Sequence, residues 1–187
     1  MMIDLLEKAQ IVEKKFMEVK RLLVDLDGVV VTYDFAKIVW DTFHVRIDAS
    51  KIRAYNLADV LGVSSKRIDE MFHDQVWGKP QFNESALEVL KEWKTKYIIA
   101  IYSNRIKYMG HRGLERWLLE WQIPFSAIDT YGTAEYFAHI DDRPEKLCDT
   151  DSKVKLLFNQ PWNQECFNIE GKLTRVYSWQ EIREIIG

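Results

Sequence analysis

The sequence predicts an α/β protein with an open parallel central sheet, and two observations lead to this fold class. Apolar runs at residues 22–24, 97–102 and 136–140 lack regular polar alternation, so each is expected to be a strand buried on both faces. Segments whose apolar residues recur at helical spacing separate these runs. Strands that alternate with helices in this way are typical of parallel sheets covered by helices.

Residues 1–20 are expected to form a helical extension ahead of the first strand. The apolar residues of this segment share one helical face: Leu5, Ala9, Val12, Phe16 and Val19. We expect this face to dock on the rest of the chain. The alternative is that it forms the contact of a homodimer.

The first strand begins a core domain, for which we expect residues 21–33 and 81–187. Between these two parts, residues 34–80 show three helical faces and predict a small helical insertion. Asn83 is then in position to cap the next helix, which continues to Lys94.

The rest of the chain continues the alternation of strands and helices. After the apolar run at 97–102, a helix at 114–121 is expected to end before Pro124. Further strands are expected at residues 127–128, 136–140, 153–158 and 173–176. A closing helix is expected at residues 179–186.

The composition argues against several classes of protein. The 187 residues suit one domain with a small subdomain, and 26 basic against 29 acidic residues argue against general nucleic-acid binding. The longest apolar run is far shorter than the roughly 20 residues of a membrane-spanning helix, so no membrane partner is expected. With two cysteines and no signal-peptide pattern, a cytoplasmic location is expected.

Polar side chains follow three of the predicted strands. They are Asp25 and Asp27, then Ser103 and Asn104, then Asp141 and Asp142. In an open α/β sheet, ligands bind beyond the carboxyl ends of the strands. If the three strands are neighbours, four carboxylates meet in one cleft, where their repulsion requires a cation or shifted pKa values. Mg²⁺ is the best candidate, because it prefers oxygen ligands and combines carboxylates with a substrate phosphate.

Each cluster also has a purely structural explanation. Asp-x-Asp is common in turns, where Asp accepts hydrogen bonds from the local backbone. Asp141 and Asp142 could instead begin a helix that has Pro144 in its first turn. The position of all three clusters at the same end of buried strands favours a functional site.

The chain resembles the haloacid dehalogenase (HAD) superfamily of phosphotransferases. Residues 25–29, Asp-Leu-Asp-Gly-Val, match its first motif, Ser103 matches the second, and the pair at 141–142 matches the fourth. Within the superfamily, the chain is similar to the 5'(3')-deoxyribonucleotidases. Three segments carry this similarity: residues 140–145, residues 158–163 with the sequence Pro-Trp-Asn, and residues 175–182.

This resemblance implies a three-layer, Rossmann-like HAD fold with a parallel central sheet and a small helical cap, here residues 34–80. It implies hydrolysis of small-molecule phosphomonoesters, with Asp25 as the nucleophile that forms an aspartyl-phosphate and Asp27 as general acid and base. The implied metal site for Mg²⁺ comprises Asp25, Asp141, Asp142 and the carbonyl of Asp27. The implied phosphate-binding residues are Ser103, Asn104 and Arg105.

One residue of the superfamily pattern is missing. The third motif is a Lys or Arg shortly before the acidic pair, and residues 117–140 contain neither. Lys107, Arg112 or Arg143 could take its place in space, with Arg105 the next candidate. Without this cation the acids and a phosphate lack one positive charge, so a weakly active or non-catalytic nucleotide-binding protein is an alternative.

Aromatic residues in and around the insertion could form a stacking wall for a nucleobase: Tyr33, Phe35, Trp40, Phe43, Trp77 and Phe82. The alternative is that they belong to a hydrophobic core, as aromatic residues at helical spacing usually do. The resemblance, carried by residues 25–29, Ser103, the acidic pair and the Pro-Trp-Asn element, implies nucleoside monophosphates, chiefly deoxyribonucleotides, as substrates. A sugar phosphate or a nucleic-acid 3'-phosphate is the alternative substrate.

Overall fold

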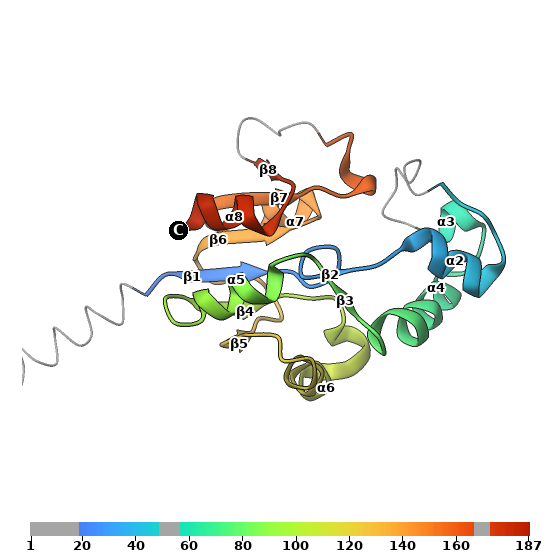
Figure 1. The fold of residues 1–187 in the computed structure, drawn as a ribbon, viewed down its shortest axis with the longest axis horizontal. Coiled ribbons are helices and arrows are strands. Elements are labelled where there is room, and N and C mark those ends of the chain that lie inside the picture. Colours follow the sequence, from blue (N-terminus) through green and yellow to red (C-terminus); the bar gives the residue numbers. More distant parts are fainter. Residues whose placement is uncertain (1–18, 49–56, 167–172) are drawn as a thin grey trace, which may run out of the picture.

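Six parallel strands form a central sheet in the computed structural model, which describes residues 19–48, 57–166 and 173–187 (Figure 1). In spatial order the strands are β5 (Ala127–Ile128), β4 (Ile98–Ile101), β1 (Arg21–Val24), β6 (Tyr136–Asp141), β7 (Ser152–Phe158) and β8 (Thr174–Val176). All neighbouring pairs in this sheet run parallel, which confirms the predicted fold class. The helix expected in residues 1–20 lies almost wholly outside the described residues.

The central strands are buried on both faces, as their apolar runs predicted. On β1, Leu22 and Val24 belong to the main hydrophobic core, whereas Leu23 belongs to a separate cluster with Ala100 and Tyr136. Successive side chains of a strand point to opposite faces, so these two clusters lie on the two sides of the sheet.

Helices cover both faces and produce a three-layer arrangement. Three of them contribute buried residues to the main core: α5 (Ala86–Trp93), α6 (Ile106–Glu120) and α8 (Trp179–Ile186). On the opposite face, α7 (Pro144–Asp149) packs Leu147 against Leu157 of β7.

The helix α6 is interrupted at Gly110, whose φ of 67° and ψ of 171° are non-helical. The apolar pattern indicated the part after this break, from residue 114 on. The first turn of α6 begins at Ile106, just after the polar residues that follow β4. No helix among the described residues, α6 included, is long and apolar enough to cross a membrane.

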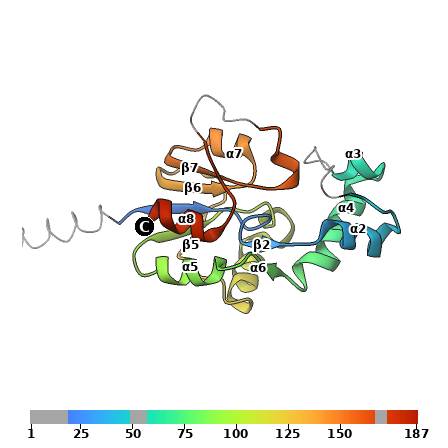
Figure 2. The same cartoon turned by 45° about the horizontal axis from the view of Figure 1, so that its top comes forward.

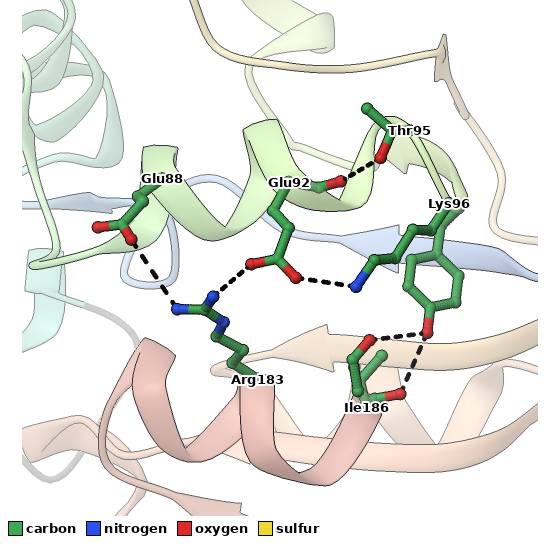
Figure 3. Close-up of polar contacts among 8 residues, drawn as sticks. Glu88, Glu92, Thr95, Lys96, Arg183 and Ile186 are labelled. Atoms are coloured by element: carbon green, nitrogen blue, oxygen red, sulfur yellow. Dashed lines mark hydrogen bonds and ion pairs between the residues drawn. The ribbon is translucent and has the colours of Figure 1, made fainter.

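Helices α5 and α8 lie side by side and are joined by polar contacts (Figure 3). Nη2 of Arg183 lies 2.6 Å from Oε2 of Glu92, whose Oε1 lies 2.9 Å from Nζ of Lys96. The Tyr97 hydroxyl donates to the Ile186 carbonyl at 3.1 Å. The contacts of Arg183 with Glu92 and of Tyr97 with Ile186 attach the closing helix to the core.

The insertion has helices and a hydrophobic cluster of its own. Its described helices are α2 (Phe35–Phe43), α3 (Leu57–Leu61), α4 (Ser65–Met71) and the π-helical turn η2 (Phe72–Trp77). They surround buried residues that include Val39, Ile68 and Met71. A short antiparallel ribbon of β2 (Val31–Thr32) and β3 (Gln81–Phe82) connects the insertion to the core. Figures 1 and 2 show α2, α3 and α4 beyond the end of the sheet to which the strand arrows point.

The expectation that Asn83 caps α5 is wrong. The helix begins after Ser85, and the Asn83 side-chain amide donates to the Val29 carbonyl at 2.7 Å. The Asn83 side chain therefore binds a backbone carbonyl far away in the sequence and does not cap α5. The bond supports the loop between β1 and β2.

Candidate active site

The three polar clusters predicted from the sequence lie at one edge of the sheet. β1 pairs with β4 on one side and with β6 on the other, so the ends of these strands are neighbours. Their contact continues past the strand ends, because the Asp25 N–H donates to the Ile140 carbonyl at 3.0 Å. All three strands run parallel, so the residues that follow them share the carboxyl edge, where open α/β sheets bind ligands.

Carboxylate oxygens of Asp25, Asp141 and Asp142 lie within 4.8 Å of one another. Burial raises the pKa of Asp25 well above its ordinary value of 3.8, and the neighbouring carboxylates raise it further. Burial likewise raises the pKa of Asp142, as does the charge of Asp141. The site therefore concentrates negative charge in a buried position, which is costly without a counter-charge.

This cluster fits a divalent cation. Oδ1 of Asp142 is buried and has no hydrogen-bond partner among the residues that the structure describes. A hard cation bound by oxygen ligands would remove the cost of that unpaired oxygen. Both side-chain oxygens of Asp27 bind Arg105, so the metal contact expected from Asp27 concerns its carbonyl oxygen.

The Pro-Trp-Asn element forms the 3-10 turn η3 (Pro161–Asn163) and supports Asp142. The Nε1–H of Trp162 donates to Oδ2 of Asp142 at 2.7 Å. The side-chain amide of Asn163 donates to the carbonyl oxygens of Asp142 and Phe158, both at 2.8 Å. These bonds fix Asp142 and leave its Oδ1 for another partner.

Asp141 is held by the turn that follows β6 and by a histidine of the same strand. Its Oδ1 accepts the Arg143 N–H at 2.8 Å, and its Oδ2 lies 3.3 Å from Nε2 of the buried His139. Nδ1 of His139 lies 2.7 Å from the Thr150 hydroxyl. From the sequence, His139 was expected to be a surface or packed residue with no role at the site, and it is buried. Strand alternation could have found it, because residues 139 and 141 share one face of β6.

A tight loop between β1 and β2 carries Asp27. The Val31 N–H donates to the Leu26 carbonyl at 2.7 Å. Gly28 has a φ of +84°, which L side chains rarely adopt, and a Cβ at this position would lie 2.5 Å from Oδ2 of Asp142. Glycine therefore lets the loop approach the acidic cluster closely.

Asp27 forms a bidentate ion pair with Arg105, which the sequence analysis did not predict. Nε of Arg105 lies 2.9 Å from Oδ2, and Nη2 lies 2.7 Å from Oδ1. The side chain of Arg105 is fully buried, and its guanidinium carbon lies 4.1 Å from the ring centroid of Trp117. The guanidinium that we expected to bind phosphate is therefore engaged by Asp27.

Two cavities meet at the site. The smaller, of about 40 Å³, is lined by residues that include Asp25, Ser103 and Lys146. The larger, of about 250 Å³, lies between the insertion and the core. Asp27 and Asn104 line both cavities, so the two cavities adjoin at these residues.

Aromatic side chains make up much of the wall of the larger cavity. Three of them were expected there: Tyr33, Phe35 and Trp77. Three more were not expected in this wall: Phe72, Tyr108 and Trp162. The rings of Phe35 and Trp162 meet edge to face with centroids 4.9 Å apart. Trp162, which donates to Asp142, therefore also contacts the insertion.

The remaining aromatic residues of the expected wall lie elsewhere. Phe43 packs against the cluster inside the insertion, and Phe82 packs against the main core. Trp40 is exposed. The core explanation therefore holds for Phe43 and Phe82, whereas Trp40 lines neither of the two cavities and belongs to none of the described core clusters.

The candidates for the missing cation divide into two groups. Lys107 and Arg112 are exposed and line neither of the two cavities. Arg143 lines the smaller cavity, and its Nε and Nη2 donate to Oε1 of Glu145 at 2.8 and 2.5 Å.

The sequence analysis missed Lys146, which also lines the smaller cavity. It lies on α7, which starts with Pro144 directly after the acidic pair. That position was the available signal, because the first turn of a helix that follows a strand stays close to the carboxyl end of the sheet.

No family model matches the sequence, and no curated protein matches it. The structure is similar to that of a haloacid dehalogenase-like family hydrolase from Streptococcus pneumoniae, with a TM-score of 0.62 and 13% sequence identity over 91% of this chain and 100% of that one. It is also similar to a Clostridium difficile protein assigned as a phosphatase, with a TM-score of 0.54 and 13% identity over 90% of this chain and 99% of that one.

A HAD-superfamily hydrolase of subfamily IA from Geobacter sulfurreducens is a third similar structure, with a TM-score of 0.50 and 12% identity over 90% of this chain and 97% of that one. At these identities the similarity concerns the fold. The chain thus has the three-layer fold found in HAD hydrolases, and the similarity to deoxyribonucleotidases stays a prediction.

Proposed function

We propose that this chain is a magnesium-dependent phosphomonoesterase that hydrolyses nucleoside monophosphates, with 5'(3')-deoxyribonucleotides as its preferred substrates. The observation that supports this best is the meeting of Asp25, Asp141 and Asp142 at one edge of the sheet, where Asp25 and Asp141 line a small cavity together with Ser103. Oxygen ligands and a hydroxyl donor in one cleft suit a phosphoryl group held with a cation. The fold shared with HAD hydrolases adds support by analogy.

In the first step, a carboxylate oxygen of Asp25 attacks phosphorus, and the bond from phosphorus to the ester oxygen breaks. The product on the protein is an aspartyl-phosphate. Protonated Asp27 donates its proton to the departing oxygen, so the nucleoside leaves as an alcohol. Asp27 suits this role because it lines both cavities. In the proposed binding mode, the phosphoryl group fills the smaller cavity and the organic part of the substrate fills the larger one.

In the second step, water attacks the phosphorus of the aspartyl-phosphate. Asp27 takes a proton from this water, which returns it to its protonated form. Cleavage of the bond between phosphorus and the Asp25 oxygen releases inorganic phosphate and restores the carboxylate. Ser103 and Asn104 would bind phosphoryl oxygens in both steps.

Mg²⁺ would be held by Asp25, Asp141 and Asp142 together with the carbonyl of Asp27. Bound there, it would offset the negative charge of the carboxylates and of the phosphoryl group. The support for this site is the buried Oδ1 of Asp142, which has no partner within the described part of the chain.

The larger cavity supports an aromatic leaving group. Tyr33, Phe35 and Trp162 supply ring faces or edges that can contact a nucleobase. A sugar phosphate has no flat apolar surface to match this wall. A nucleoside therefore suits the pair of cavities better than a sugar does.

The ion pair of Asp27 with Arg105 favours a second candidate function, a nucleotide-binding protein with weak or no turnover. One guanidinium engages both carboxylate oxygens, and Asp27 has to change this contact in order to donate a proton. Binding of a nucleotide in the presence of Mg²⁺ without hydrolysis would support this second candidate.

The test is the release of inorganic phosphate from a panel of monoesters, measured with MgCl₂ or with EDTA. The panel comprises 5'- and 3'-deoxynucleotides, ribonucleotides, glucose 6-phosphate and an oligonucleotide 3'-phosphate. We expect the highest kcat/KM with deoxynucleotides and no turnover in EDTA. Preference for the sugar phosphate or for the oligonucleotide end would contradict the proposed substrate class.

The matched variants are Asp25→Asn and Asp149→Asn. Asp149 is an exposed carboxylate at the end of α7 and serves as the control. We expect Asp25→Asn to abolish turnover and Asp149→Asn to leave it unchanged. Equal turnover by Asp25→Asn and the unmodified protein would contradict the role of Asp25.

A further inference from the structure

A phosphoryl group in the smaller cavity requires more positive charge than one divalent cation supplies. Asp25, Asp141 and Asp142 contribute carboxylates to this region, and a phosphomonoester adds a dianion. Charges at such short distances interact strongly in a partly desolvated site. A basic side chain that reaches the phosphoryl oxygens would therefore contribute to catalysis.

Two basic side chains at the site are engaged by carboxylates. Arg105 forms the bidentate pair with Asp27 and lines the larger cavity, not the smaller one. Arg143 donates twice to Glu145. The carboxylates of Asp27 and Glu145 therefore partly neutralise the two guanidinium groups.

Lys146 has a different kind of partner. Its Nζ donates to the Tyr102 hydroxyl at 2.6 Å and lies 4.8 Å from the centroid of the same ring. A phenol accepts a hydrogen bond without carrying a negative charge. The contact with Tyr102 therefore orients the ammonium group without neutralising it.

The bond between Lys146 and Tyr102 joins two segments that border the smaller cavity. Tyr102 follows β4 and directly precedes Ser103, whereas Lys146 belongs to α7, which follows β6. Because β1 lies between β4 and β6, this bond joins the segments that follow the two strands on either side of β1, whose end carries Asp25. All four residues line the smaller cavity.

From this arrangement we infer that Lys146 is the cation of the phosphoryl site, with its Nζ bound to a phosphoryl oxygen, and that Tyr102 positions it. The inference rests on the proposed function for the reaction, but the binding of phosphate alone also tests it. The charge is supplied from α7, after the acidic pair. Residues 117–140, which precede that pair, contain no Lys or Arg.

The experiment compares Lys146→Ala and Lys146→Arg with Lys153→Ala, which removes an exposed ammonium group from β7. Two quantities are measured with Mg²⁺ present: kcat for a deoxynucleotide, and the Kd for inorganic phosphate by calorimetry. We expect Lys146→Ala to lower kcat roughly 100-fold and to raise the Kd roughly 10-fold. Lys146→Arg should restore part of both quantities, and Lys153→Ala should change neither.

Tyr102→Phe tests the positioning role. The substitution keeps the ring and removes the hydroxyl that accepts from Lys146. We expect a smaller loss in kcat than for Lys146→Ala, together with a raised Kd for phosphate. In the Lys146→Ala background, Tyr102→Phe should have no further effect on phosphate binding. An equal effect in both backgrounds would contradict the positioning role.

The outcomes separate this inference from the proposed function. Wild-type kcat and phosphate affinity in Lys146→Ala would overturn the role of Lys146. If the unmodified protein releases phosphate from no substrate, the proposed function fails. The Kd for inorganic phosphate then tests the role of Lys146. Weaker binding by Lys146→Ala would support the inference, and unchanged binding would overturn it.

Discussion

The guanidinium of Arg105 binds both carboxylate oxygens of Asp27, with Nε 2.9 Å from Oδ2 and Nη2 2.7 Å from Oδ1. Arg105 is buried and lies over the ring of Trp117, so packing against α6 fixes its position. The ion pair holds Asp27 where the two cavities meet. Arg105 thus positions the residue that we propose as general acid.

If Arg105 acts through Asp27, their substitutions should not be additive. Asp27→Asn is expected to lower kcat for a deoxynucleotide roughly 100-fold or more, because proton transfer is lost. Arg105→Ala should cause a smaller loss, and the double variant should lose no more than Asp27→Asn alone. The measurement is kcat from phosphate release. Multiplicative losses in the double variant would show that Arg105 contributes independently of Asp27.

Trp162→Phe should weaken the metal site while the ring packing is largely kept. The substitution removes the Nε1–H that donates to Oδ2 of Asp142. We expect unfolding free energy to fall by about 1–3 kcal/mol and Mg²⁺ affinity to fall roughly 10-fold. Chemical denaturation and calorimetric titration with MgCl₂ measure the two effects. Trp40→Phe, at an exposed position of the insertion, is the control and should change neither.

Gly28→Ala should be more destabilising than Gly62→Ala. Both glycines have positive φ, so both substitutions share a strain of about 1–3 kcal/mol. The added Cβ at position 62 meets nothing within 4 Å, whereas at position 28 it would lie 2.5 Å from Oδ2 of Asp142. Thermal unfolding should show the larger loss for Gly28→Ala, and calorimetry should show weaker Mg²⁺ binding. Equal losses would mean that Gly28 is needed for its φ alone.

The stability of the metal-free protein should fall as pH rises from about 4. The pKa values of Asp25 and Asp142 are raised above 3.8 by burial and by neighbouring carboxylates. In the pH range between 3.8 and these raised values, the native state holds protons that the unfolded chain has released. Each increase in pH through that range therefore disfavours the native state.

Thermal unfolding across pH 5–8 in EDTA or MgCl₂ checks this prediction. Protons compete with Mg²⁺ for the same carboxylates, so the stabilisation by MgCl₂ should increase with pH. In Asp142→Asn the dependence on pH should be weaker, because one of the two groups no longer titrates. A metal-free stability that rises through this pH range would contradict the raised pKa values.

The buried strands and their common edge could be predicted because the relevant signal is local. The runs that became β1, β4 and β6 are apolar without regular alternation, and each ends in polar residues. Parallel strands of one sheet share a carboxyl edge, which predicts that Asp25, Ser103 and Asp141 come together.

Other parts of the site depend on contacts between distant segments. The ion pair of Asp27 with Arg105 joins two loops separated by the whole insertion. Nothing in the sequence around either residue indicates the other as its partner. The ribbon of β2 and β3 has two residues in each strand, too few for a periodic pattern. The role of Trp162 depends on where its indole N–H finds an acceptor, which the spacing of Pro-Trp-Asn does not reveal.

The central claim is that Asp25 attacks phosphorus, and trapping its phosphorylated form tests this most directly. The protein is mixed with a deoxynucleotide that carries radiolabelled phosphate, quenched with acid during turnover and digested for peptide mass spectrometry. The account predicts a hydroxylamine-sensitive label on the peptide that contains Asp25, and none in Asp25→Asn. Phosphate release at the full rate without label on Asp25 would contradict it.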